Sequence, residues 1–297
     1  MIQITRILCP IDFSEFSRHA FDHAAAIARW YEAPLTLLYV FPSLLAIDLP
    51  PVVMDDKDRE RIMIEIRRFA GHVPPEVPLD ICIEAASDIH REILRQAEAI
   101  RADLLVMGSH GRSGFERLLL GSVTEKVIRK ASCPTMIVPP RAPDKAPDEP
   151  VQFRRILCPV DFSDGSVRAL MFAMNMAEEA DAQLTALHVI EVPPELRENI
   201  LSEGFDVDAV RAATEADRLR RLRELIPDEA QTYCTVETAV REGAAYREIL
   251  KVAADRNADL IVMGVHGRGA FDVMVFGSNT VRVIRAATCP VLIVRRE

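Results

Sequence analysis

A glycine pattern suited to holding phosphate occurs twice in the chain. Its spacing is G-x2-G-x9-G-S, at Gly108, Gly111, Gly121 and Ser122, and again at Gly264, Gly267, Gly277 and Ser278. Glycines let a backbone come close to a phosphate and present N–H groups without a Cβ in the way. The last glycine and serine open a predicted helix, whose first N–H groups and dipole favour an anion. The pattern therefore indicates a phosphate site in each half, where Ser122 and Ser278 can donate a hydroxyl.

The same residues also have a simpler interpretation. A glycine after a strand is often only a turn residue, and a serine before a helix is often only its N-cap. Ser122 also fits a capping box with Glu125. The spacing is nevertheless kept in both copies although the residues between changed, from ERLLL at 116–120 to DVMVF at 272–276, which favours a shared constraint.

Both segments belong to a duplication of the whole chain. RILCPIDFS at 6–14 returns as RILCPVDFS at 155–163, and ADLLVMGSHGR at 102–112 returns as ADLIVMGVHGR at 258–268. The offset grows from 149 to 156 residues, which places about seven additional residues in the second copy, within 191–231. Proline and charged residues fill the stretch between the copies. We expect a domain at 1–139, a linker at 140–152 and a second domain at 153–297.

Strands and helices are predicted to alternate within each copy. Ser14 is expected to cap the first helix. In the first copy the apolar patterns predict strands at 4–11, 35–41, 79–85, 104–107 and 135–138, and helices at 14–31, 55–70, 88–101 and 122–131. This alternation predicts an α/β fold with a parallel, doubly wound sheet in each domain.

Composition excludes several classes of protein. The formal net charge is −9 and the basic residues are scattered, which argues against binding nucleic acid. No stretch approaches the roughly 18 apolar residues of a membrane span, and the N-terminus does not resemble a signal peptide, so we expect a cytoplasmic protein without a membrane partner.

Four cysteines precede prolines at equivalent places and are expected to be buried structural residues: Cys9, Cys133, Cys158 and Cys289.

With these residues in view, the chain resembles the universal stress protein family, whose ATP-binding members carry this glycine pattern after the fourth strand. The resemblance covers nearly the whole chain twice, including Asp12 and the closing CPTMIV and CPVLIV segments. It implies a five-stranded sheet of order 3-2-1-4-5 in each domain, with a ligand in the crevice beside the first and fourth strands. It also implies an internal pseudo-dimer formed through the last strands, and a homodimer of two chains.

The resemblance further implies which residues would hold ATP. Asp12 and the backbone of Ile11 would approach the nucleoside, and Val40 would contact adenine. The less favoured alternative for Asp12 is a turn residue in an Asx turn ahead of Ser14. The expected first site comprises Pro10, Ile11, Asp12, Val40, Met107, Gly108, His110, Gly111, Arg112, Gly121, Ser122, Val123 and Thr124. The expected second site comprises Pro159, Val160, Asp161, Val189, Met263, Gly264, His266, Gly267, Arg268, Gly277, Ser278, Asn279 and Thr280. The histidines and arginines among them are either phosphate partners or ordinary solvated loop residues.

Binding is expected rather than dedicated catalysis. The chain has neither a G-x4-G-K-[ST] loop nor an S-G-G-x-D-S turn, and a lone carboxylate, Asp12 or Asp161, is weak evidence for Mg²⁺. The resulting hypothesis is an ATP-binding stress-response protein, in which the nucleotide changes stability or partner choice. The alternatives are a nucleotide-free dimerisation or adaptor module and a slow ATPase.

The two sites are not expected to be equal. The second copy has Val281 in place of Glu125, which removes the capping box, and Val273 in place of Arg117, which removes a positive charge. We therefore predict that the first copy binds ATP more tightly.

Overall fold

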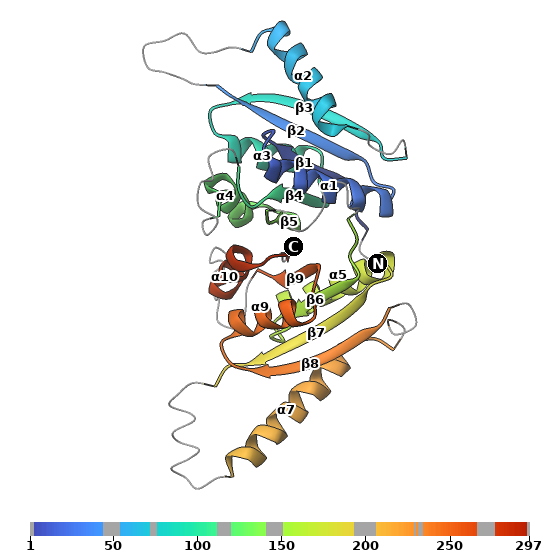
Figure 1. The fold of residues 1–297 in the computed structure, drawn as a ribbon, viewed down its shortest axis with the longest axis vertical. Coiled ribbons are helices and arrows are strands. Elements are labelled where there is room, and N and C mark those ends of the chain that lie inside the picture. Colours follow the sequence, from blue (N-terminus) through green and yellow to red (C-terminus); the bar gives the residue numbers. More distant parts are fainter. Residues whose placement is uncertain are drawn as a thin grey trace. The chain divides into compact units, whose positions relative to one another are not determined.

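The structure is a computed structural model that describes residues 3–43, 54–71, 76–111, 120–140, 151–192, 206–228, 230, 234–265 and 277–295. It divides into two compact units, the first ending at Gln152 and the second beginning at Phe153. Each unit holds one copy of the repeat (Figure 1). The expected pairing of the two domains through their last strands stays a prediction.

The first unit contains a parallel sheet. Its described strands are β1 (Ile7–Ile11), β2 (Leu35–Pro42), β3 (Leu79–Ala86), β4 (Leu104–Gly108) and β5 (Thr135–Val138). They lie in the order β3-β2-β1-β4-β5, and all the pairs are parallel. The predicted order 3-2-1-4-5 is therefore confirmed in this unit.

The second unit repeats this sheet. Its described strands are β6 (Arg155–Pro159), β7 (Gln183–Ile190), β8 (Val236–Glu242), β9 (Leu260–Gly264) and β10 (Val291–Val294). Their order is β8-β7-β6-β9-β10, again with parallel pairs. The α/β fold class predicted from the alternating pattern holds for both copies.

Helices connect successive strands. In the first unit they are α1 (Glu15–Trp30), α2 (Asp56–Ala70), α3 (Ile89–Ala99) and α4 (Ser122–Lys130). In the second they are α5 (Asp164–Glu179), α7 (Val207–Glu224), α9 (Ala245–Asp255) and α10 (Ser278–Ala286). Right-handed crossovers place α1 and α2 on one face of their sheet and α3 and α4 on the other. The observed packing of α3 on α4, and of α9 on α10, agrees with this arrangement.

The central strands form the core because they are aliphatic throughout. All five residues of β4 are buried, as expected for a parallel strand covered by helices on both faces. The expected strand at 4–11 begins three residues late, at Ile7. Instead of pairing in the sheet, Thr5 donates from its N–H and its hydroxyl to the Asp103 carboxylate, at 2.9 and 2.6 Å.

The cysteines are structural, as predicted. Cys9, Cys133, Cys158 and Cys289 are buried and form no disulfide. Burial raises the pKa of the Cys9 and Cys158 thiols far above its usual range, so both stay protonated and unreactive.

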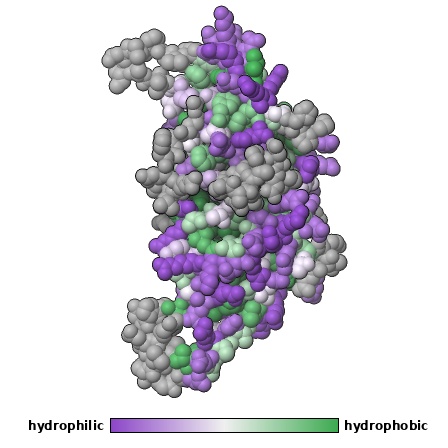
Figure 2. Space-filling model, viewed as in Figure 1, coloured by the Kyte–Doolittle hydropathy of each residue, from purple (hydrophilic) through white to green (hydrophobic). Residues whose placement is uncertain are grey.

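Figure 2 shows hydrophilic side chains over much of the visible surface, with smaller hydrophobic areas between them. The most exposed large apolar side chain in the described ranges is Ile64 on α2, at 61%. None of the described helices combines the length and the apolar character that crossing a bilayer requires.

Candidate functional site

The first candidate site lies where β1 and β4 end side by side. Asp12 follows β1 directly, and Gly108 is the last residue of β4. In an open parallel sheet this is the switch point, because the connections leave the two strands in opposite directions and open a crevice. In the second copy Asp161 follows β6 after one further residue, Val160, and Gly264 is again the last residue of its strand, β9.

One carboxylate oxygen of Asp12 shapes the turn into α1. Asp12 Oδ1 accepts from the Ser14 N–H at 3.0 Å and from the Ser14 hydroxyl at 2.5 Å. Ser14 in turn accepts from the Ser17 N–H, which makes it the N-cap of α1, as predicted. The intervening Phe13 has a φ of 63°, a left-handed conformation that few non-glycine residues adopt. The Asx-turn interpretation of Asp12 is therefore correct for this oxygen.

The other carboxylate oxygen lies against the glycine loop. A Cβ placed on Gly111 would lie 2.7 Å from Asp12 Oδ2, closer than real Cβ contacts come. A side chain at position 111 would have to push this oxygen away. Two predicted site residues that are 99 positions apart in the sequence are thus brought together.

The first glycine of each pattern serves the packing of strand against helix. A Cβ on Gly108 would lie 3.0 Å from the Phe16 carbonyl oxygen, and one on Gly264 would lie 2.8 Å from the Gly165 carbonyl carbon and oxygen. The missing side chain lets the strand end pass directly beneath the first turn of the helix. The geometry thus gives these two glycines a fold role, and their contact with phosphate stays a prediction.

The predicted capping box at Ser122 is wrong. Gly121 is the N-cap of α4, and Ser122 is an exposed residue at the first helical position. Glu125 instead pairs with Arg129, one turn along the helix, at 2.9 Å. A serine can cap only from the position before the helix, and the helix here begins one residue earlier than the box requires.

The caps of α4 and α10 do not make the two sites unequal. α10 is also capped by a glycine, Gly277, without a side-chain hydrogen bond. In α4 the first helical bond runs from the Glu125 N–H to the Gly121 carbonyl, so the N–H groups of Ser122 and Val123 precede the ladder. Both helices therefore begin with a glycine and with backbone donors that no capping side chain covers.

The threonines of the two expected sites make their side-chain contacts inside the protein. Thr124 donates its hydroxyl to the Gly108 carbonyl at 2.9 Å, and Thr280 donates to the Gly264 carbonyl at 3.3 Å. Both side chains are buried. They tie the start of the helix to the end of the strand, so a ligand role for them would rest on their backbone N–H groups.

His110 carries an unusual nitrogen. Its Nδ1 lies 2.9 Å from the Ser109 hydroxyl, and its ring packs on Phe16 with centroids 5.5 Å apart. Its Nε2 is buried without a hydrogen-bond partner, the one such side-chain atom in the described part of the chain. An enclosed polar group left unpaired costs about 1–3 kcal/mol. A ligand oxygen within reach of Nε2 would remove that cost.

The nucleoside side of the expected sites contains residues that the sequence did not single out. In the first copy Tyr39 pairs with Ile11 and its ring lies 4.9 Å from that of Phe13. In the second copy the equivalent residue is His188, 6% exposed, whose Nδ1 lies 2.7 Å from the Val160 carbonyl. Only the cross-strand register reveals these contacts, because nothing in the local pattern marks the two positions.

The remaining predicted residues occupy the strands and helices around these sites. Val40 follows Tyr39 and is buried, whereas Val189 in the second copy is half-buried. Pro10, Ile11 and Met107 belong to β1 and β4, Pro159 and Met263 belong to β6 and β9, and Val160 follows β6. Ser278 and Asn279 open α10 as Ser122 and Val123 open α4. Arg112, His266, Gly267 and Arg268 lie outside the described residues.

A cavity of about 300 Å³ lies at the carboxyl ends of β7 and β8. Its lining includes the carboxylates Glu191 and Glu242. Glu191 also accepts from the Ala245 N–H at 2.7 Å. Glu242 pairs with Arg211 at 2.9 Å, so one of the two carboxylates of this cavity already has a cationic partner.

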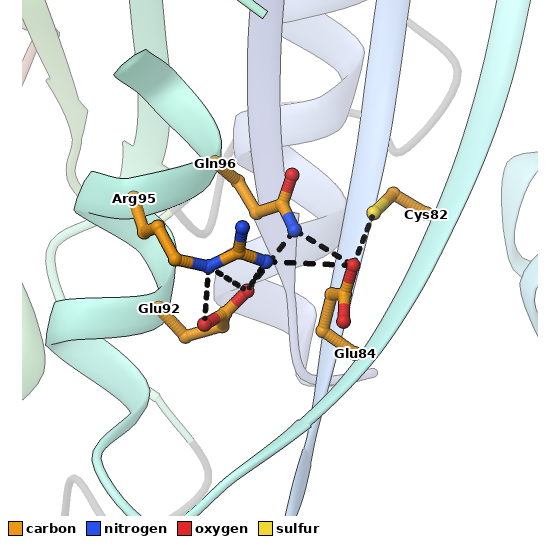
Figure 3. A network of polar contacts seen from close by, with 5 residues as sticks. All are labelled: Cys82, Glu84, Glu92, Arg95 and Gln96. Carbon is orange, nitrogen blue, oxygen red and sulfur yellow. Dashed lines mark hydrogen bonds and ion pairs between the residues drawn. The ribbon is translucent and has the colours of Figure 1, made fainter. Parts of the chain in front are cut away.

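A second polar network lies away from the glycine loop, on β3 and α3 (Figure 3). Gln96 donates to Glu84 at 2.8 Å and to Glu92 at 3.0 Å, and Arg95 pairs with Glu92. The Arg95 hydrogen bonds lower the pKa of Glu92, while burial raises the pKa of the adjoining Cys82 thiol. The network fastens α3 to the edge strand and offers no reactive thiolate. No group of three or more His, Cys, Asp or Glu side chains within the described ranges is placed to hold a metal ion.

Comparison with known proteins places this architecture in a family. The model of the universal stress protein family matches residues 3–139 and 152–295. A universal stress protein of Mycobacterium tuberculosis is 30% identical over 313 residues, which cover 98% of this chain and 96% of the relative. Another from the same species is 31% identical over 205 residues, covering 66% of this chain but only 63% of the relative. The crystal structure of a universal stress protein from Archaeoglobus fulgidus has the same fold, with a TM-score of 0.69 and 23% identity over 99% of this chain and 97% of that one.

Proposed function

Because the chain belongs to the universal stress protein family, we propose that each copy binds an adenine nucleotide, ATP, during the cellular stress response. Occupancy of the sites would stabilise the native protein or change which partner it binds, since a ligand shifts any equilibrium between states that bind it unequally. This is a binding function and requires no catalytic group.

The meeting of Asp12 and Gly111 carries the proposal. With glycine at position 111 the loop lies directly against the Asp12 carboxylate, because a Cβ there would come within 2.7 Å of Oδ2 and displace it. The contact joins a carboxylate to the glycine loop at the point where β1 and β4 end. A carboxylate at a crevice accepts hydrogen bonds from hydroxyl groups, such as those of a ribose.

The charges of the site give the nucleotide a direction. The Asp12 carboxylate repels phosphate, whereas the start of α4 attracts it through backbone N–H groups and the helix dipole. The nucleoside would therefore lie toward Asp12 and Val40, and the phosphates toward Gly121 and Ser122. The unpaired His110 Nε2 also fits an anionic ligand, because a phosphate oxygen would give that nitrogen the partner that it lacks.

The test is direct. The purified chain would be denatured, and any released nucleotide identified by chromatography and mass spectrometry, followed by calorimetric titration of nucleotide-free protein with ATP. We expect ATP or another adenine nucleotide to be released, and ATP to bind with and without Mg²⁺, more weakly after EDTA if the ion bridges the phosphates. A protein that is empty and ignores ATP would instead be the nucleotide-free adaptor module.

The assembly and location of the protein are also proposals. We propose that two chains form a homodimer in the cytoplasm, where ATP is abundant. Light scattering on the purified protein at several concentrations measures the first point: a mass near 33.2 kDa throughout would contradict it, because this is the mass of one chain.

A further inference from the structure

We propose that His110 is the phosphate-reading side chain of the first site, held in position by Ser109 and Phe16, and that the second site lacks this device. The inference rests on the proposed nucleotide binding and adds to it a residue that distinguishes ATP from adenosine. It also supports the prediction that the first copy binds ATP more tightly than the second, without relying on the capping box.

The His110 ring is fixed from two sides. The Ser109 hydroxyl lies 2.9 Å from Nδ1, and the Phe16 ring packs on the imidazole with centroids 5.5 Å apart. A hydroxyl both donates and accepts, so a proton donated to Nδ1 leaves Nε2 carrying the ring N–H. That Nε2 is buried and has no partner. The ring is thus pre-positioned, and in the tautomer with the proton on Nε2 it carries one unused donor.

The location of His110 assigns this donor to phosphate. The Gly121 N–H donates to the Ser109 carbonyl at 2.9 Å, and a Cβ on Gly121 would lie 3.4 Å from His110 Cα. His110 therefore borders the start of α4, where an anion is favoured. The Asp12 carboxylate, which is unfavourable for phosphate, lies instead against Gly111.

The second copy retains the histidine but neither support. Position 266 is again His, whereas the residue equivalent to Ser109 is Val265 and the residue equivalent to Phe16 is Gly165. Val265 is buried and has no hydroxyl, and Gly165 has no side chain to cover a ring. The strand and helix are also closer there, since a Cβ on Gly264 would lie 2.8 Å from the Gly165 backbone. Neither equivalent residue can repeat the contacts that hold His110, and a side chain that is not held in advance loses more rotamer freedom on contacting a ligand.

Calorimetry on the full chain tests the assignment, with adenosine, AMP, ADP and ATP as ligands. Gly277→Val blocks the second site so that the first is measured alone, and Gly121→Val provides the mirror chain. In the first site His110→Phe keeps a ring against Phe16 but removes Nε2. We expect ATP affinity to fall about 10- to 100-fold, with adenosine affinity unchanged. The matched change His266→Phe in the second site is expected to cost about threefold or less.

The positioning role has its own variants. Ser109→Val copies the second site and is expected to weaken ATP about three- to tenfold without affecting adenosine, while Ser109→Thr restores binding because it returns the hydroxyl. In the unaltered chain, ¹⁵N NMR should show the His110 Nε2 resonance moving with ATP but not with adenosine. That measurement does not depend on how any variant folds.

The outcomes separate the two proposals. Equal losses for adenosine and ATP, unchanged ATP affinity in His110→Phe, or an Nε2 resonance that does not respond to ATP would each overturn the role of His110 while leaving ATP binding intact. A chain that binds no adenine nucleotide at all would overturn both.

Discussion

The two turns that enter the candidate sites have nearly the same geometry but different surroundings. In both copies the aspartate accepts from the serine N–H at 3.0 Å, and Phe13 and Phe162 have φ values of 63° and 64°. Around Phe13 lie the rings of Tyr39 and Phe69. Around Phe162 lie His188 and the guanidinium of Arg221, which is 4.2 Å from the ring centroid.

The comparison shows which contacts the duplication kept. Backbone contacts that set the strand ends and helix starts are the same in both copies, because a change there would disturb the sheet. Side chains facing the crevice have diverged, as Tyr39 and His188 show. The copies are therefore equivalent as folds and different as sites.

The largest expected effect concerns the strand glycines. Gly264→Ala should destabilise the chain by about 1–3 kcal/mol, because its Cβ would overlap the Gly165 backbone and neither backbone segment can move cheaply. Gly108→Ala should cost less, since its nearest contact is 3.0 Å rather than 2.8 Å. Urea unfolding of the two variants measures the difference, and equal costs would mean that the two units pack their first helices alike.

Next in size is the buried histidine of the second copy. His188→Phe keeps a ring beside Phe162 but leaves the Val160 carbonyl without its donor, at a cost of about 1–3 kcal/mol. Urea unfolding again provides the measurement, with His188→Asn as a control that retains a donor. Stability that is unchanged in His188→Phe would show that water replaces the lost donor.

A change at Gly111 should affect the site more than the fold. Gly111→Ala would push Asp12 Oδ2 away by a few tenths of an ångström, which the end of a side chain accommodates. We expect ATP affinity at the first site to fall about tenfold, or 1.4 kcal/mol, with a loss of stability below about 0.5 kcal/mol. Calorimetry and thermal unfolding of the same preparation measure both, and an equal free-energy loss in each would place Gly111 with the structural glycines.

The smallest expected effect is at Arg221. Arg221→Ala removes the cation–π contact with Phe162 and should cost about 0.5–1 kcal/mol, whereas Arg221→Lys should retain part of it. The nearest counterpart in the first copy is Phe69, whose ring meets Phe13 edge-on at 5.7 Å. If Arg221→Ala leaves the free energy of unfolding unchanged, the two turns differ in the residues around them but not in the stability that those residues contribute.

The fold could be predicted almost completely from the sequence, and the site only in outline. Apolar periodicity predicts where the strands lie. Ser14 is predicted as an N-cap because it stands directly before the amphipathic pattern of α1. At α4 two adjacent candidates, Gly121 and Ser122, stood at the helix start, and a one-residue difference decided the cap. The contact of His188 with Val160 joins β7 to the residue that follows β6. It depends on the register between these two strands, which a local sequence pattern does not determine.

The position of Gly108 beneath α1 has a consequence for how such sequences are interpreted across genomes. A chain that abandoned its ligand would still be destabilised by a side chain there, because its Cβ would crowd the Phe16 backbone. A side chain in place of Gly111, by contrast, would displace the Asp12 carboxylate without disturbing the sheet. The second glycine, rather than the first, is then the informative marker for separating nucleotide binders from relatives that have kept only the scaffold.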